Sequence, residues 1–199
     1  METARMALLI AGILTLGCGE SPFATDRSGG GSTSGGTGAT GGAPVFEADC
    51  SDGPLGAPIA DCAPEMMAST GDPAQDCVNR VNQLRWECQC LPPLERWTGG
   101  ESCAEQHAEY DTTRPPHSGF SDRICAEGGW AQNECPGMGW NSIDQVVRGC
   151  LQAMWDEGPG PWGPAHGHYI NMTNPDYSRV ACGFAQTGDG QVWAVQNFQ

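Results

Sequence analysis

The segments Val180-Ala-Cys-Gly-Phe184 and Val192-Trp-Ala-Val195, close to the C-terminus, decide the fold class of this chain. Both are short and rich in residues that favour strands, and Thr187-Gly-Asp-Gly190 lies between them. Glycines at such positions supply the backbone conformations that a tight turn requires. The pattern therefore predicts a β-hairpin in this part of the chain.

Upstream of the hairpin, the apolar residues follow a helical period instead. Asp72 and Pro73 are the residue types that favour a helix N-cap and the first helical position. Apolar residues then recur at helical spacing, which predicts a first helix from about residue 73 to 88. A second helix is expected over residues 101–110.

A third helix is expected to begin at Ser142, which forms a capping-box pattern with Gln145, and to stop at Gly158. Because helices come first and strands later, the order of elements predicts an α+β domain. We expect a small, largely antiparallel sheet flanked by helices.

Composition and charge exclude several classes of function. The chain has 199 residues, a formal net charge of −15 and no lysine. An acidic surface without clustered basic residues argues against a nucleic-acid partner, because phosphate backbones are bound by Lys and Arg. The absence of lysine excludes Schiff-base chemistry on a lysine. No stretch of the sequence reaches the roughly 20 apolar residues of a transmembrane helix.

Eleven cysteines indicate an oxidising compartment. Without Cys18 an even number remains, which fits up to five disulfides with a connectivity that the sequence does not give. A zinc or iron–sulfur site is the alternative, but the chain has only one close pair, Cys88-Gln-Cys90, and no C-x-x-C motif. The ten candidates for disulfides are Cys50, Cys62, Cys77, Cys88, Cys90, Cys103, Cys125, Cys135, Cys150 and Cys182.

The N-terminus reads as an export signal followed by an anchor. Residues 1–17 have the charged start and apolar run of a signal peptide. Leu14-Thr-Leu-Gly-Cys18 resembles the lipobox of bacterial lipoproteins, with Thr15 where leucine is usual, so Cys18 is the expected lipidation site. Residues 18–49 then form a linker rich in Gly, Ser and Thr, and residues 50–199 form the domain.

This organisation predicts an exported protein that is lipid-anchored in the bacterial cell envelope, at the outer membrane or cell surface. The membrane is then a partner through the anchor. An ordinary secretory signal, which would give a freely secreted protein, is the alternative.

Several motifs in the domain together resemble the CAP superfamily, which includes cysteine-rich secretory proteins, insect venom allergens and plant pathogenesis-related proteins. Gly167-His-Tyr-Ile-Asn-Met172, followed by Val180-Ala-Cys-Gly183, resembles the first signature of the family. Residues 193–198 resemble the second, with Gln196 in place of a cysteine and Phe198 in place of a tyrosine. With matches at residues 81–85 and 91–94, the resemblance spans about residues 75–199.

The resemblance implies an α-β-α sandwich with a cavity lined by two histidines and two acidic residues. His168 and His117 match the histidines, and Glu157 matches one acid. Gln132 stands where the other acid belongs, so glutamine replaces glutamate. Glu127 is the competing assignment for that position.

Two imidazoles and a carboxylate in one cavity have the chemistry of a site for a divalent metal such as zinc, with His117, Glu157 and His168 as ligands. The alternative is a buried, hydrogen-bonded polar network that fixes the fold. A hydrolase that uses His117-Ser118 and Glu157 is a further alternative, but neighbouring residues rarely form a nucleophile–base pair, and no G-x-S-x-G motif occurs.

The expected function is therefore that of a membrane-tethered module that binds an apolar or envelope-derived ligand. Alternatives are a hydrolase of peptide or envelope polymer and a structural or defensive protein. His107 is expected to be a packed helix residue, and the sequon at Asn171 to be a coincidence. Tryptophans are expected in the core, or in a groove for a lipid, sterol-like or glycan ligand: Trp86, Trp97, Trp130, Trp140, Trp155 and Trp162.

Overall fold

The computed structural model describes residues 48–199. The expected signal peptide, Cys18 and the linker up to residue 47 lie outside these residues, so those predictions stay predictions. Within the described part, no helix is both long and apolar enough to cross a membrane.

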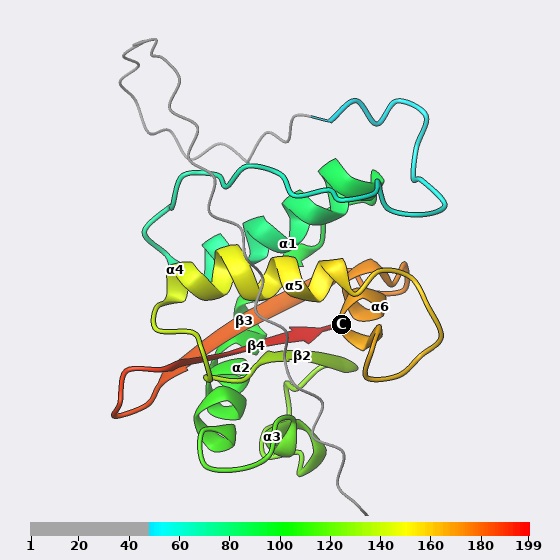
Figure 1. Ribbon diagram of the computed structural model, residues 1–199. Helices are drawn as coiled ribbons and strands as arrows, with labels where there is room; N and C mark the ends of the chain where they lie inside the picture. Colours follow the sequence, from blue (N-terminus) through cyan, green and yellow to red (C-terminus); the bar gives the residue numbers. More distant parts are fainter. Residues whose placement is uncertain (1–47) are drawn as a thin grey trace, which may run out of the picture. The chain divides into compact units, whose positions relative to one another are not determined.

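Two short strands lie between helices in the described part of the chain, and two longer strands follow all of its helices (Figure 1). The helices are α1 Pro73–Gln89, α2 Thr98–Asp111, α3 Ser118–Ser121, α4 Ile143–Gln145, the π-helical segment η1 Val146–Cys150, α5 Leu151–Asp156 and α6 Gly167–Thr173. The strands are β1 Glu95–Arg96, β2 Ala131–Cys135, β3 Arg179–Gln186 and β4 Val192–Phe198.

The strands form one mixed sheet in the order β1-β3-β4-β2. The expected hairpin is confirmed: β3 and β4 are antiparallel and pair from Val180 with Phe198 to Gln186 with Val192. Strand β2 adds antiparallel to β4, and the two-residue β1 adds parallel to β3. The sheet is therefore largely antiparallel with one short parallel edge.

Helices cover both faces of the sheet, which confirms the α+β sandwich (Figure 1). Side chains of successive strand residues point to opposite faces. Val180, Cys182 and Ala194 belong to the larger core with α1, α5 and α6, whereas their neighbours Ala181 and Trp193 pack with α2.

Gly183 lets α2 lie directly on β3. A Cβ atom at this position would stand 2.1 Å from the backbone nitrogen of Glu105 in α2, far inside van der Waals contact. The close approach needs a residue without a side chain. This explains the glycine in the Val180–Gly183 motif.

The predicted helix ends are largely confirmed. Asp72 caps α1 by accepting hydrogen bonds from the backbone nitrogens of Ala74 and Gln75. Ser142 caps α4 by accepting from the backbone nitrogen of Gln145. The Gln145 side chain accepts from the backbone of Asn141 instead of Ser142, so the capping box is not reciprocal.

The third helix differs from the expected regular helix. Its middle turn, Val146–Cys150, is π-helical, a feature that the apolar spacing does not reveal. It ends as predicted before Gly158, whose φ of 62° is in the left-handed region.

All ten predicted cysteines form disulfides, and each bond joins different parts of the fold. The pairs are Cys50–Cys90, Cys62–Cys88, Cys77–Cys182, Cys103–Cys125 and Cys135–Cys150. Each such bond typically contributes about 2–4 kcal/mol by restricting the unfolded chain. The bonds restrain a domain that has long loops.

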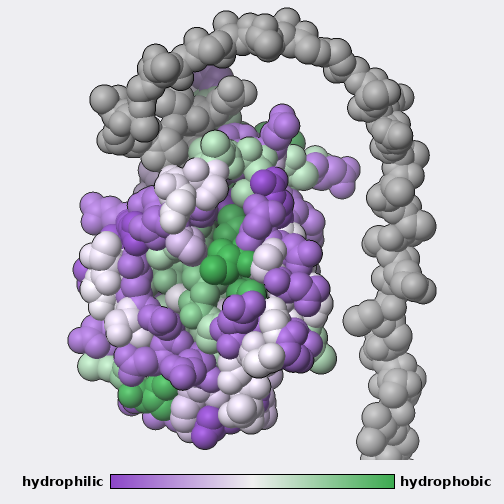
Figure 2. Space-filling view, turned by 90° about the vertical axis from the view of Figure 1, so that its left-hand side faces the viewer, coloured by the Kyte–Doolittle hydropathy of each residue, from purple (hydrophilic) through white to green (hydrophobic). Residues whose placement is uncertain are grey.

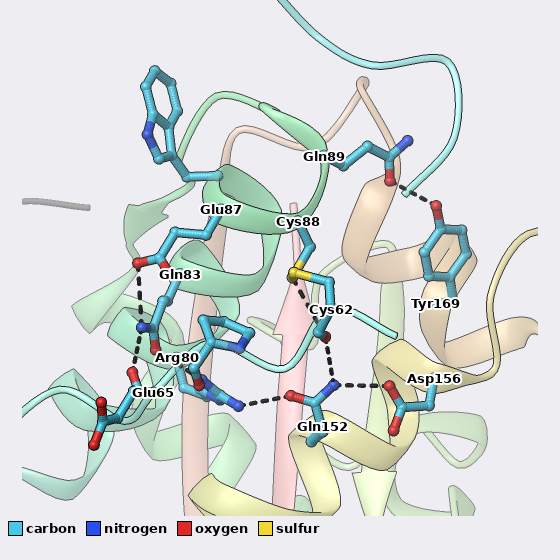
Figure 3. Close-up of a disulfide and its surroundings, with 12 residues drawn as sticks. Cys62, Glu65, Arg80, Gln83, Glu87, Cys88, Gln89, Gln152, Asp156 and Tyr169 are labelled. Atoms are coloured by element: carbon cyan, nitrogen blue, oxygen red, sulfur yellow. Dashed lines mark hydrogen bonds between the residues drawn. A yellow bond between two sulfur atoms is a disulfide. The ribbon is translucent and has the colours of Figure 1, made fainter. Parts of the chain in front are cut away.

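Figure 3 shows how the Cys62–Cys88 bond sits in a polar network that holds the segment before α1. The carbonyl of Cys62 accepts a hydrogen bond of 3.0 Å from Gln152 in α5, and Arg80 in α1 donates to the same glutamine at 2.7 Å. Gln83 donates to the carbonyl of Glu65 at 2.6 Å. The disulfide and these bonds together fix residues 62–65 against two helices.

Candidate functional site

Both predicted histidines line one cavity of about 520 Å³. His117 is the N-cap of α3, and His168 lies in the first turn of α6. Their ring centroids are 6.3 Å apart. Gln132, from β2, lines the same cavity. Residues about fifty positions apart in sequence are thus brought together.

Glu157 lies directly behind His168, at the end of α5. One carboxylate oxygen accepts from His168 Nδ1 at 2.5 Å, and the other accepts from the backbone nitrogen of His168 at 2.9 Å. The carboxylate therefore caps the N-terminus of α6, where backbone N–H groups lack helical partners. It also orients the imidazole, so that Nδ1 carries a proton and Nε2 is the second, free position.

Gln132 orients His117 in the same way. Its Oε1 lies 2.8 Å from His117 Nδ1, while its Nε2 donates to Asn197 Oδ1 at 3.2 Å and faces His107 Nδ1 at 2.9 Å. Because the amide nitrogen can only donate, Oε1 is the end that accepts from His117. His117 therefore carries its proton on Nδ1. Glu127, the competing assignment, is exposed and does not line the cavity.

Two buried asparagines connect the two halves of the site. Asn133 in β2 donates to the carbonyl of His168 at 3.0 Å. Asn171 in α6 donates to Asn133 Oδ1 at 2.9 Å and to the carbonyl of Gln132 at 3.2 Å. Asn171 is only 4% exposed, so its amide is committed to the fold and its sequon is not open to a glycan.

Two buried carboxyl groups hold the turn that carries His117. The backbone nitrogen of His117 donates to Glu134 at 2.5 Å, and that of Gly119 donates to Asp111 at 2.7 Å. His117 has a φ of 66°, an uncommon conformation for a residue with a side chain. Such strain persists where surrounding contacts enforce it. No pattern of residues predicted this role for either carboxyl group.

Burial raises the pKa of Glu134, the His117 N–H bond lowers it, and the charge and hydrogen bond of nearby Asp111 also raise it, which together give a pKa of about 8. Glu134 Oε1 and Asp111 Oδ2 have no other hydrogen-bond partner. A proton on Glu134 that is donated to Asp111 satisfies both groups at once. Glu134 is therefore neutral at neutral pH.

The residues present do not complete the predicted metal site. Within residues 48–199, only one group of three His, Cys or carboxylate side chains has its ligand atoms within 4.8 Å of one another. This group is Cys103, His107 and Cys125, and it does not line the cavity of His117 and His168. Glu157 is engaged by His168, and Gln132 by His117. Two imidazoles remain, fewer than the three protein ligands typical of catalytic zinc. We therefore assign no chemistry to a metal here.

Ser118 does not form the hydroxyl–imidazole pair that the hydrolase alternative requires. Its hydroxyl donates to the carbonyl of Pro115 at 2.7 Å, as in a turn. A nucleophilic serine needs a base within hydrogen-bond distance. Ser118 therefore has a structural role in the turn before α3.

Aromatic side chains form the walls of the cavity. Phe120, Trp130, Trp162 and Tyr177 line it, and Trp130 and Trp162 are 64% and 72% exposed. From the sequence we expected tryptophans either in the core or in a groove. The spacing of the residues did not distinguish the exposed Trp130 and Trp162 from the buried tryptophans. The site thus combines a polar floor with apolar walls.

A second hollow lies on another face. Figure 2 shows an apolar strip bordered by hydrophilic side chains on the side where α4 lies in Figure 1. A pocket of about 230 Å³ there is lined by residues of the loop before α1, of α1 and of α4–η1, among them Met66, Ile143 and Val147. It holds none of the histidines.

Substitution of Glu134 by Gln tests the neutral carboxyl group. The folded state keeps a proton that the unfolded chain releases above about pH 4.5, so the free energy of unfolding falls as pH rises from about 4.5 to about 8. Gln keeps the hydrogen bonds and has no proton to lose. We expect Glu134→Gln to gain stability over the wild type by roughly 1.4 kcal/mol per pH unit in that interval.

Guanidinium unfolding with intact disulfides, followed by circular dichroism from pH 5 to 9, measures this difference. Glu127→Gln, the same chemical change at an exposed position, is the control. Parallel stability curves for the wild type and Glu134→Gln would rule out a protonated Glu134.

Comparison with known proteins identifies the family of this chain. A family model described as "CAP: Cysteine-rich secretory protein family" matches residues 78–198. A solved structure titled "Structure of BmVAL-1" is similar at 16% sequence identity, covering 66% of this chain and 78% of that chain, with a TM-score of 0.43. No curated protein sequence matches this chain.

The family model spans more than half of the chain, and the expected resemblance is confirmed. Five disulfides and the secretory character of the family indicate an extracellular protein. The chain belongs to the CAP family of cysteine-rich secretory proteins.

Proposed function

We propose that this protein is a binding module on the outside of a bacterial cell, and that the cavity of His117 and His168 takes a glycan of the cell envelope. The observation that carries this proposal is the pairing of exposed aromatic walls with two oriented imidazoles. Glycan binding of this kind requires no metal and no covalent chemistry.

The walls suit a sugar ring. A pyranose has an apolar face of C–H groups that packs on aromatic rings, and Trp130 and Trp162 present large exposed ring systems. Exposed tryptophans lose little conformational freedom on binding, because their side chains have two rotatable bonds. A volume of about 520 Å³ accommodates a ligand of one or two sugar rings.

The floor suits hydroxyl groups. With Nδ1 held by Gln132 or Glu157, each imidazole offers Nε2, which accepts from a hydroxyl when the ring is neutral and donates to one when it is charged. A purely apolar lipid or sterol would leave these polar atoms without partners, which is unfavourable in a closed site. The polar floor therefore favours a glycan over a lipid or sterol-like ligand.

Substitution of Trp130 by Ala tests the site. We expect the dissociation constant for a soluble envelope glycan fragment to rise by about tenfold or more, as for loss of a stacked aromatic anchor. Isothermal titration calorimetry with muropeptides and lipopolysaccharide-derived oligosaccharides measures it. Met138→Ala removes an apolar residue that is 81% exposed and outside the cavity, and should bind as the wild type does.

Three results would contradict the glycan assignment. The first is no binding of any fragment by the folded wild type, which favours a structural or defensive role. The second is equal loss of affinity in Trp130→Ala and Met138→Ala. The third is native mass spectrometry that retains only a lipid, which points to the apolar pocket beside α4 instead.

We also propose that the domain is tethered to the membrane through a lipidated Cys18. The lipobox-like Leu14–Cys18 supports this, together with a linker of small residues that has the composition of a flexible spacer. An N-terminal cysteine with more than one acyl chain anchors stably. A tether of this kind would keep a glycan-binding domain close to its ligand.

Expression of the full chain in a Gram-negative host tests the anchor. We expect the wild type in the membrane fraction, with a mature N-terminus at Cys18 that carries acyl chains by mass spectrometry. The Cys18→Ser variant should move to the soluble extracytoplasmic fraction. A mature wild-type N-terminus at another residue, or an unmodified Cys18, would contradict lipidation.

A further inference from the structure

One disulfide has a histidine beside its sulfur atoms. In the Cys103–Cys125 bond, which joins α2 to the segment after α3, His107 Nε2 lies 3.2 Å from Cys125 Sγ and 3.7 Å from Cys103 Sγ. His107 is 1% exposed, so burial fixes its ring in this position. The proximity is therefore part of the packed structure.

The hydrogen-bond network decides which nitrogen of His107 carries the proton. Gln132 Nε2 lies 2.9 Å from His107 Nδ1 and is a donor, so Nδ1 is the acceptor. Burial lowers the pKa of His107, against a raising hydrogen bond from Asn197 and the charge of Asp111, which keeps the ring neutral. The proton of the neutral ring is then on Nε2 and points at the sulfur atoms.

The bond is open from one side. Cys125 is partly exposed and, with His107, lines a cavity of about 660 Å³. Cys103 is 2% exposed. Cys125 is therefore the cysteine of this bond that an attacking group can approach from the cavity. Phe120 and Trp130 line both this cavity and the one that holds His117, so the two sites are neighbours.

We propose that Cys125 is a site of covalent modification by low-molecular-weight thiols, in which His107 assists the departure of Cys103. The proposal rests on this cluster alone and does not depend on glycan binding. Among the five disulfides of the described residues, this bond alone has an imidazole within hydrogen-bond distance of its sulfur atoms.

The reaction is a thiol–disulfide exchange. The thiolate of the small molecule attacks Cys125 Sγ and forms a new S–S bond, while the Cys103–Cys125 bond breaks and Cys103 leaves with the electron pair as a thiolate. The Nε2–H of His107 donates a hydrogen bond to that thiolate, which makes it a better leaving group. Cys103 then takes a proton from solvent. The products are a mixed disulfide at Cys125 and a free thiol at Cys103.

Reduced glutathione is the probe for the test. The oxidised full-length protein is incubated with it, quenched at successive times with an alkylating maleimide in denaturant, so that the buried Cys103 can react, and mapped by peptide mass spectrometry. We expect a glutathione adduct at Cys125 and alkylation at Cys103. The adduct should form about tenfold faster than any adduct at Cys50–Cys90 or Cys62–Cys88, which also have one partly exposed sulfur each.

A matched pair of variants tests whether His107 assists the departure of Cys103. His107→Leu removes the donor, and exchange at Cys125 should slow by about tenfold, whereas His107→Gln keeps an N–H donor and should stay within about threefold of the wild type. Exchange at Cys125 no faster than at the two comparison bonds, an adduct at Cys103 instead, or equal rates in the two variants would overturn the proposal. If a variant fails to fold, the comparison of exchange rates at Cys125 and at the two other bonds within the wild-type protein still tests the proposal.

Discussion

Strand β2 pairs with β4 along its whole length, and its three central side chains are buried, on alternating faces of the sheet, and are all polar. Gln132 accepts from the ring of His117, Asn133 holds the carbonyl of His168, and Glu134 accepts from the backbone of His117. Buried polar groups are tolerated only when they are paired. The geometry of the cavity therefore depends on this strand, since it contacts both histidine-bearing segments from a rigid position in the sheet.

The rest of the fold keeps that strand in place. The Cys135–Cys150 bond ties the end of β2 to η1, and hydrophobic cores on both faces hold the sheet between α2 and the layer of α1, α5 and α6. The histidines themselves lie on short helices at the surface, which have little stability of their own. A rigid sheet thus supports a site whose walls are loops and single helical turns, an arrangement common to many binding proteins.

Local patterns in the sequence predicted the main elements well. The hairpin, the caps at Asp72 and Ser142 and the participation of ten cysteines in disulfides all follow from residue types a few positions apart. The pairing of the cysteines, the two-residue β1 and the π-helical turn depend on contacts between distant segments, and no local pattern encodes them. The family resemblance brought His117, Gln132, Glu157 and His168 into consideration. It did not reveal that Glu157 and Gln132 act by orienting the two imidazoles, or that Glu134 is a neutral acid, because burial and hydrogen-bond partners decide those properties.

The central claim, that the polar groups of β2 and the end of α5 set the orientation of each imidazole, is tested most directly by the tautomers of the four histidines. Long-range ¹⁵N–¹H correlation spectra, recorded at a pH where the rings are neutral, assign the protonated nitrogen of each ring. The structure predicts Nε2–H for His107 and Nδ1–H for His117, His168 and His166, whose Nδ1 faces the carbonyls of Glu157 and Gly158 at 2.8 and 3.0 Å. A proton on Nε2 of His117 would contradict the account, because Gln132 would then have no donor to accept from.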